Sequence, residues 1–319
     1  MTREDVLNSI ALKKRFCKDC NIPIAVFDNP YFSERLETLD ILNDCEFKFY
    51  KFCLELESFD SEQDYFEHYN SVKDKMITHI KNNPTYQVFN EQNIDKLDVG
   101  VNKRNLYVEQ NDGGTFVSID MKQANFTALR QFSKSIFDNC ETWEEFVGKF
   151  TDSKHMAKSK YIRQVVMGAC NPKQQIKFER FLMSILCKHI MDTVDGDVNI
   201  YSLGDDEIII TIDNPNEPSE FSSGFSLNEL RVAINTCIGG IGELVRVDMF
   251  DLHKIGNVGW MKTYYGDEDR VEFKCLDAEI FHQIVKHYYG VPITEDDLVF
   301  YHNGRLAKFL KEVDNPWKE

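Results

Sequence analysis

The chain has 319 residues and a formal net charge of -16, with 37 Lys and Arg against 53 Asp and Glu. This balance excludes a surface that is basic as a whole, so on charge alone nucleic acid is a poor partner. Apolar residues make up 42% of the sequence, which excludes disorder caused by low hydrophobicity. The length predicts two or three subdomains, or one domain with a large insertion.

The sequence predicts a protein of the reducing cytoplasm that has no membrane partner. Its first residues, MTREDVLNSIALKKRF, mix both signs of charge and do not form an apolar export signal. No run of about 18 apolar residues predicts a membrane span. Only Cys17 and Cys20 form a CxxC pair, and no second pair follows at zinc-binding spacing, so we expect free thiols. The histidines also lack zinc spacing and are expected to be structural or exposed.

Residues 1–104 are predicted to form a helical amino-terminal domain. Asn-Pro pairs at 29–30 and 83–84 punctuate the helical runs YFSERLETLDIL and SVKDKMITHIKN. The first 100 residues hold 12 basic and 19 acidic residues, a charge of -7. This acidic domain is a candidate surface for a protein partner.

Strand patterns begin in a second domain, predicted over residues 105–265. Residues 115–120, TFVSID, follow an Asn-Asp-Gly-Gly turn and predict a strand. Helical periodicity covers about 126–192, with breaks at Gly168 and at Asn171-Pro172. The segment DVNIYSLGDDEIIITI predicts a hairpin. A loop rich in Asn, Pro, Ser and Glu, a helix at 226–238, and the strands LVRVDMF and NVGWMKTYY follow.

Residues 266–319 are predicted to form a small carboxy-terminal α/β subdomain. One helix is expected over DAEIFHQIVKHYYG, with Gly290 as its stop, and a last helix over GRLAKFLKEV, capped by Asn303. The order of strand, helices, hairpin, helix and strand in the second domain predicts the α+β class. In that class we expect an antiparallel sheet that helices cover on one face.

Three carboxylates are the candidate catalytic residues. Asp205 and Asp206 stand at the predicted hairpin tip, and Asp120 ends the strand at 115–120. Paired charges at the ends of buried strands usually need a compensating cation. Acids on two neighbouring strands can hold two Mg²⁺, which orient and neutralise a triphosphate for attack by a hydroxyl. The alternatives are a polar surface turn for Asp205 and Asp206, and a helix N-cap for Asp120.

Two segments resemble motifs of a known superfamily. VSIDMKQANFTALR resembles motif A, and YSLGDDEIII resembles motif C, of the palm domain of template-directed polymerases. That superfamily includes reverse transcriptases, RNA-dependent RNA polymerases and Pol I type DNA polymerases, and the resemblance, over about residues 112–265, suggests a divergent viral or phage branch.

The resemblance implies a palm-like sheet with a fingers-like helical insertion and a thumb-like carboxy-terminal subdomain. The implied activity is template-directed nucleotidyl transfer, with nucleoside triphosphates as substrates and nucleic acid, RNA or DNA, as template and primer. Mg²⁺ or Mn²⁺ would be bound by Asp120, Asp205 and Asp206.

The same resemblance suggests residues that contact nucleotide or template. Gln123 matches the Pol I pattern, and position 125, which senses the sugar in such enzymes, is Asn125, followed by Phe126. Asn125 mildly favours ribonucleotides, and Phe126 could act as a steric gate. Equally, Asn125 could be a helix-surface residue and Phe126 a core residue. The choice between ribonucleotides and deoxyribonucleotides therefore stays open.

Residues 154–180 carry seven basic residues and one acid, a local charge of +6. Lys160 or Arg163 could contact the triphosphate, and the rest could follow a template backbone. MGACNP, with Gly168, resembles the turn of motif B. The alternative is a solvated basic helix face.

The resemblance also implies a lysine after the hairpin that acts as a general acid for the leaving pyrophosphate. Lys254 is the better positional candidate and Lys262 the second, although either could be a surface lysine. Two other functions stay open. GDDEI resembles the hairpin of diguanylate cyclases, but Asp120 and Asp205 are 85 residues apart, too far for the compact cyclase spacing. The chain could also be a non-catalytic, polymerase-like subunit of a larger complex.

Overall fold

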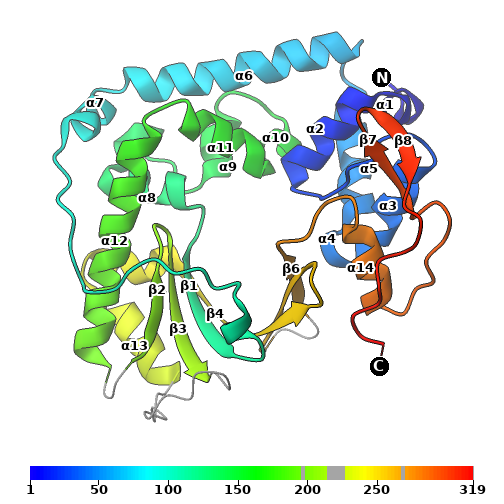
Figure 1. Cartoon of the computed structure of the whole chain (residues 1–319). Coiled ribbons are helices and arrows are strands. Elements are labelled where there is room, and N and C mark those ends of the chain that lie inside the picture. The colour runs from blue at the N-terminus through cyan, green and yellow to red at the C-terminus, as the bar shows by residue number, and fades with distance from the viewer. Residues whose placement is uncertain (195–197, 214–226, 267–269, 319) are drawn as a thin grey trace. The chain divides into compact units, whose positions relative to one another are not determined.

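The computed structural model describes residues 1–194, 198–213, 227–266 and 270–318. The chain divides into two compact units, each made of non-consecutive segments (Figure 1). The helical unit comprises residues 1–79, 140–166 and 276–319, and the sheet unit comprises residues 80–139 and 167–275. The predicted boundaries after residues 104 and 265 both fall inside the sheet unit. The three consecutive domains expected from the sequence therefore do not coincide with these units, because patterns along the chain do not report which distant segments pack together.

The amino-terminal part of the helical unit is helical, as the sequence predicts. Its core is aromatic: Phe16, Phe32, Phe49 and Phe52 are all buried, and the rings of Phe16 and Phe49 lie 5.1 Å apart. The helices of this unit are α1 (Arg3–Asn8), α2 (Ile10–Cys20), α3 (Tyr31–Thr38), α4 (Asp40–Asn43), α5 (Cys45–Leu56), most of α6 (Glu62–Asn82), α9 (Trp143–Gly148), α10 (Lys154–Lys158), most of α11 (Lys160–Gly168) and α14 (Phe281–Tyr288).

The prediction of a last helix over GRLAKFLKEV is wrong. Residues of that segment form β8 (Arg305–Lys308), which pairs antiparallel with β7 (Val299–His302). Asn303 and Gly304 join the two strands with φ angles of 49° and 77°. Asn-Gly favours this two-residue turn because both residues tolerate positive φ, and its twist matches that of a hairpin. Asn303 is therefore a turn residue and not a helix cap, whereas the predicted stop at Gly290 after α14 is confirmed.

The sheet unit contains a six-stranded antiparallel sheet in the order β2-β3-β1-β4-β5-β6. The predicted strand, hairpin and later strands are confirmed, as is the α+β class. The polar loop predicted before α13 lies outside the described residues. The strands are β1 (Thr115–Met121), β2 (Ile200–Leu203), β3 (Glu207–Asp213), β4 (Val245–Ile255), β5 (Gly259–Tyr264) and β6 (Val271–Lys274). The helices are α7 (Pro84–Glu91), α8 (Ala124–Phe132), α12 (Pro172–Thr193) and α13 (Leu227–Thr236), with short 3₁₀ turns η1 (Glu109–Asn111), η2 (Lys134–Phe137) and η3 (Ile238–Leu244).

The connections of the first four strands follow a split βαβ pattern. β3 lies between β1 and β2, and β1 lies between β3 and β4, so each helical crossover skips one strand. Alternate residues of β1, among them Val117 and Ile119, pack with α12 and α13 in one core cluster. This cluster places the helices on one face of the sheet (Figure 1).

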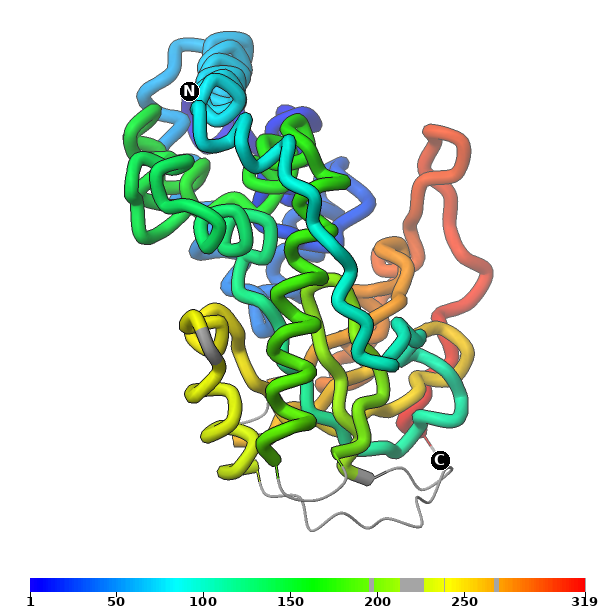
Figure 2. The backbone as a smooth tube through the Cα atoms, turned by 90° about the vertical axis from the view of Figure 1, so that its left-hand side faces the viewer, coloured from blue at the N-terminus to red at the C-terminus, as the bar shows by residue number. Residues whose placement is uncertain are grey.

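The opposite face of the sheet, here called the open face, carries a second and smaller core. Phe116, Ile209 and Phe250 meet Leu106 there. Leu106 belongs to residues 92–108, which contain bends but no helix or strand and are here called the strap. The strap runs beside α12 before it reaches the sheet (Figure 2). It therefore covers part of the open face and leaves one end of β1 outside this apolar cluster.

The cysteines agree with the expectation from the sequence. All nine cysteines are free thiols. Burial and the nearby charge of Asp19 raise the pKa of Cys20 to about 12, so this thiol stays protonated at neutral pH. Among the helices that the structure describes, none is long and apolar enough to span a bilayer.

Candidate active site

Asp120 lies at one end of the open face, next to the β2–β3 turn that carries Asp205 and Asp206, whereas Asp205 also lines a pocket beside α12. Asp120, near the end of β1, pairs across the strands with Glu207, the first residue of β3. Direct antiparallel partners share a face, with Cβ atoms about 4.5–5.5 Å apart. The β2–β3 turn is held beside them, because the Met121 amide donates to the Asp206 carbonyl at 2.8 Å. Glu207 was missed by the sequence interpretation, although its alternation with Ile209 places it on the open face.

Burial and neighbouring acids raise the pKa of two carboxyl groups at this site. Burial and the charges of Glu207 and Asp206 raise the pKa of Asp120 to about 6, against the opposing effect of Arg246. Burial and the charges of Asp206 and Asp205 raise the pKa of Glu179, on α12, to about 7. Negative charge therefore accumulates on both sides of the hairpin turn, and a bound cation would relieve it.

Basic side chains already form ion pairs with two of these acids. Arg246 lies 3.4 Å from Asp120 and 2.6 Å from Asp248, and Lys103 lies 3.1 Å from Asp205. Within the described ranges, no three His, Cys, Asp or Glu side chains are arranged to hold a metal ion. The donors are all carboxylate oxygens, the ligands that Mg²⁺ prefers. Arg246 and Lys103 thus compensate part of the acidic charge within the chain.

The Gly204 turn is shaped by close backbone contacts. The Gly204 amide donates to the Glu207 carbonyl at 2.7 Å, and a Cβ at position 204 would lie 3.1 Å from that oxygen. Arg180 of α12 donates to the Gly204 carbonyl at 2.8 Å and also to the carbonyl of Leu203. Arg180 was predicted within the basic segment. In the structure it fixes the turn that carries Asp205 and Asp206.

The two candidate lysines lie in different places. Lys254 pairs with Glu109 at 2.5 Å and stands eight residues along β4 from Arg246, the cross-strand partner of Asp120. Eight strand residues span roughly 26 Å, so the structure does not bring Lys254 to the acids. Lys262 of β5 is only 5% exposed, and its ammonium lies 4.1 Å from the centre of the Phe250 ring. Its charge acts on Asp120 and Glu207, which makes Lys262 the lysine nearer the site.

The residues in and next to α8 and α11 that were predicted to contact nucleotide or template differ in their burial. Gln123 precedes α8 with a φ of 49°, and Asn125 is half-buried. Phe126 is 2% exposed and packs against Phe137, with ring centres 4.6 Å apart, which matches the core alternative. Gly168 ends α11, and a Cβ there would meet no atom within 4 Å. The site thus has no steric need for glycine at position 168.

The basic segment 154–180 is divided between the two units. Lys160 and Arg163 belong to the helical unit, whereas Lys173, Lys177 and Arg180 belong to the sheet unit with the acids. Burial lowers the pKa of Arg163, although the nearby charge of Glu144 opposes that shift. Contact of Lys160 and Arg163 with a triphosphate stays a prediction.

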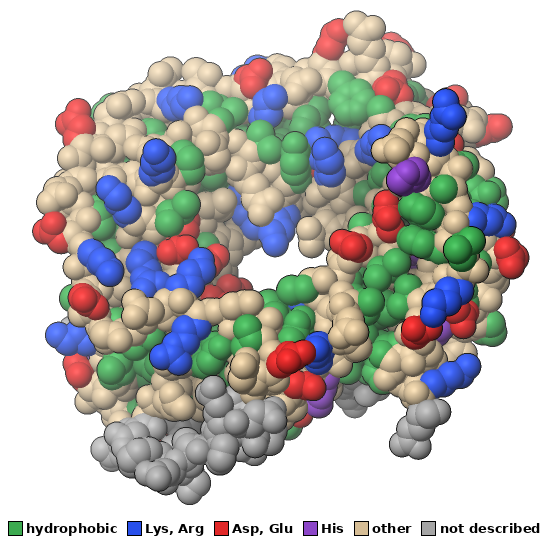
Figure 3. Space-filling model, in the orientation of Figure 1, with side chains coloured by type: hydrophobic (Ala, Val, Ile, Leu, Met, Phe, Trp, Pro, Cys, Tyr) green, Lys and Arg blue, Asp and Glu red, His purple; other side chains and the backbone are tan. Residues whose placement is uncertain are grey.

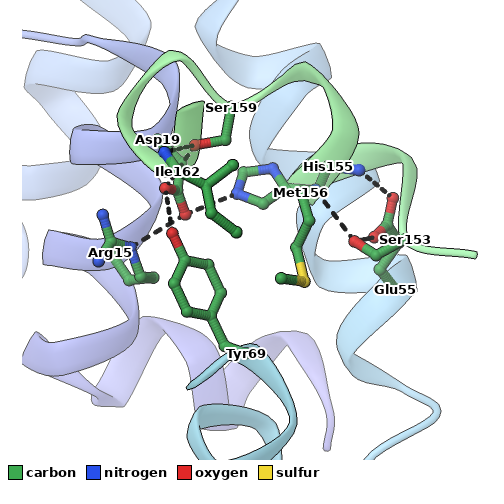
Figure 4. A network of polar contacts seen from close by, with 9 residues as sticks. All are labelled: Arg15, Asp19, Glu55, Tyr69, Ser153, His155, Met156, Ser159 and Ile162. Carbon is green, nitrogen blue, oxygen red and sulfur yellow. Dashed lines mark hydrogen bonds and ion pairs between the residues drawn. The ribbon is translucent and has the colours of Figure 1, made fainter. Parts of the chain in front are cut away.

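The helical unit contains a separate polar cluster around Asp19 (Figure 4). Arg15 and His155 lie 3.0 and 3.2 Å from one carboxylate oxygen of Asp19. The hydroxyls of Tyr69 and Ser159 donate to the other oxygen at 3.0 and 2.7 Å. Because the Asp19 side chain is fully buried and meets four donors, this cluster is a structural centre, as expected for His155.

Comparison with known proteins gives no relative: no protein-family model, curated protein or solved structure matches the chain.

Proposed function

We propose that the sheet unit is a palm-type nucleotidyltransferase that acts on nucleoside triphosphates under the direction of a nucleic-acid template. The observation that carries this proposal is the meeting of Asp120 with the Gly204–Asp206 turn at one end of the open face. The split βαβ order supports it, because it sets the strand that resembles motif A directly beside the hairpin that resembles motif C.

The carboxylate oxygens around the turn suit divalent cations such as Mg²⁺ or Mn²⁺ in their chemistry, and their side chains would have to move together to hold one. Asp120, Asp205 and Asp206 would hold the ions, and Glu207 adds a fourth carboxylate on the face of Asp120. Bound there, the ions would supply charge neutralisation for the triphosphate and activation of the attacking hydroxyl. Arg246 would release Asp120 and stay paired with Asp248, which lies 2.6 Å away.

The chain's own residues supply orientation and charge. Arg180 holds the turn by its carbonyls, so that the acids keep their position when their partners change. Burial lowers the pKa of Lys262, and the charges of Glu207 and Asp120 oppose that shift. When protonated, Lys262 would act in a partly dry environment, where electrostatic interactions are stronger than in water. We expect this ammonium to favour the negative charge that develops on a transferred phosphoryl group.

Two measurements test the proposal. Purified protein with Mg²⁺ or Mn²⁺, primer, template and nucleoside triphosphates should extend the primer, and Asp205→Asn should abolish extension. The matched control is Glu229→Gln, which changes an exposed acid on α13 of the same unit and should leave extension unchanged. Absence of extension with ribonucleotides and deoxyribonucleotides alike would sink the polymerase assignment, and reactions without template would reveal cyclic products instead.

A non-catalytic role is the second candidate, and one observation favours it. Arg246 and Lys103 already compensate Asp120 and Asp205 within the chain. In a scaffold these ion pairs would persist, and Mn²⁺ would not compete for them. Calorimetric titration with Mn²⁺ separates the two candidates, because only the enzyme should show binding that Asp120→Asn and Asp205→Asn remove.

A further inference from the structure

The strap forms one wall of a pocket at the edge of the open face. This strap pocket has a volume of about 410 Å³, and its walls come from residues 103–107 of the strap and from the β2–β3 hairpin. The wall is held in place by hydrogen bonds: the Arg104 amide donates to Ser202 at 2.8 Å, and the Leu203 amide donates to the Asn102 carbonyl at 3.3 Å. A pocket of this size and fixed shape can take one nucleotide.

The lining combines groups of opposite charge. Lys103 and Arg104 are exposed cations on the strap side, and Tyr107 adds an aromatic ring. Asp206 and Glu207 line the hairpin side with carboxylates, which would repel a bare phosphate. A nucleotide satisfies both sides, because its phosphate meets the cations while its sugar hydroxyls donate to carboxylate oxygens. Lys and Arg side chains gather next to acidic ones over the strap and α12 (Figure 3).

Lys103 belongs both to the pocket and to the proposed metal site. Its ammonium pairs with Asp205 at 3.1 Å, and the two side chains are 68% and 38% exposed. Ion pairs this exposed are weak, so a phosphate can compete for Lys103 at little cost. When Lys103 turns to a phosphate, Asp205 loses its cationic partner and becomes available to a metal ion.

We propose that the strap pocket binds the terminal nucleotide of a single-stranded nucleic acid, and that Lys103 couples this binding to cation binding by exchanging Asp205 for a phosphate. The coupling rests on the proposed function, because it needs Asp205 to be a metal ligand. Coupling between two sites is reciprocal, so each ligand must strengthen the other by the same factor.

The test compares Mn²⁺ affinity in the wild-type chain and in Lys103→Met, with and without a six-nucleotide single strand that ends in a 3′-hydroxyl. In the wild type, the strand should tighten Mn²⁺ binding by about two- to fivefold, the range that an exposed ion pair supports. Lys103→Met should bind Mn²⁺ tightly without the strand and gain nothing from it. Lys103→Arg should keep the coupling, which separates loss of charge from loss of fold.

Controls make each outcome decisive. Lys188→Met, which changes an exposed lysine on α12 of the same unit, should behave as the wild type. Inorganic phosphate and a free nucleoside monophosphate should replace the strand only at much higher concentration, and equal potency would overturn the assignment to a strand end. If Mn²⁺ binds through Asp205 but the strand has equal effects on the wild type and on Lys103→Met, the coupling is refuted while the proposed function stands. If Mn²⁺ does not bind through Asp205 at all, both fail.

Discussion

The surroundings that suit Asp120 for a cation also make its ionised form costly in the folded chain. Its pKa lies at about 6 in the folded state, against an ordinary value of 3.8. Between these two values the folded chain binds more protons than the unfolded chain. Stability is therefore lost as the pH rises from about 4 to 6, and it stays lower above that range. Asp206 and Glu207 cause part of this loss, so it belongs to the site and not to a packing defect.

Asp120→Asn should therefore stabilise the protein at pH 7 while it removes cation binding. After allowance for the partial exposure of this side chain and the lost ion pair with Arg246, we expect a gain of about 1 kcal/mol. Urea denaturation at pH 7 and pH 4 measures it, and the gain should disappear at pH 4. Glu229→Gln, the exposed control on α13, should change stability by less than about 0.5 kcal/mol at both pH values. Destabilisation at pH 7 would contradict the proposed crowding of charge.

At the scale of elements, the Asp19 cluster joins segments that the sequence separates widely. Asp19 and Arg15 lie on α2, Tyr69 on α6, His155 on α10, and Ser159 between α10 and α11. Burial alone would raise the pKa of Asp19, but the hydrogen bond and charge of His155, together with Arg15 and Ser159, lower it. The stability contributed by this carboxylate is therefore present above its ordinary pKa and is lost as the pH falls through the lower folded value.

Asp19→Ala should destabilise the helical unit by about 3 kcal/mol, because it leaves buried donors without their acceptor. Thermal and urea unfolding measure the change, and the difference from wild type should shrink as the pH falls below 3.8. The matched control is Asp74→Ala on α6, whose carboxylate is 68% exposed and pairs with Lys73 at 3.6 Å. That change should cost less than about 1 kcal/mol. Equal effects of the two substitutions would show that the Asp19 cluster is not a structural centre.

At the scale of the whole molecule, the charge of -16 limits how much nucleic acid the chain can hold. In the sheet unit, three cations near the proposed site already contact acids or carbonyls: Lys103, Arg180 and Arg246. Affinity for nucleic acid depends on the number of phosphates that cations neutralise, because each releases counterions. A chain with this charge balance should neutralise few phosphates and should bind nucleic acid weakly.

The salt dependence of binding measures that footprint. For two to four phosphates on a single strand, the slope of log affinity against log salt concentration should lie at about -1 to -3. Fluorescence anisotropy with a labelled single strand, between 50 and 200 mM salt, gives the slope. Lys103→Met should make it shallower by about 0.7. A slope steeper than about -5 would indicate a wide basic channel and would contradict the small footprint.

The sequence by itself determined most of the element types, and it placed the candidate acids at the ends of strands. The alternating residues of β1, the hairpin around Gly204 and the Asn171-Pro172 start of α12 were all predictable, because each depends on neighbours within a few residues. The Asn303-Gly304 turn carried a local signal as well, but a helical spacing of apolar residues hid it.

Only the tertiary structure decided which residues meet. It paired Glu207 with Asp120, turned Arg180 onto the Gly204 carbonyl, and set Lys262 nearer the acids than Lys254. It also joined residues 1–79, 140–166 and 276–319 into one unit, where the sequence predicted separate domains. The physical reason is that strand register and helix packing depend on the burial of apolar surface between segments far apart in the chain, which patterns along the chain do not report.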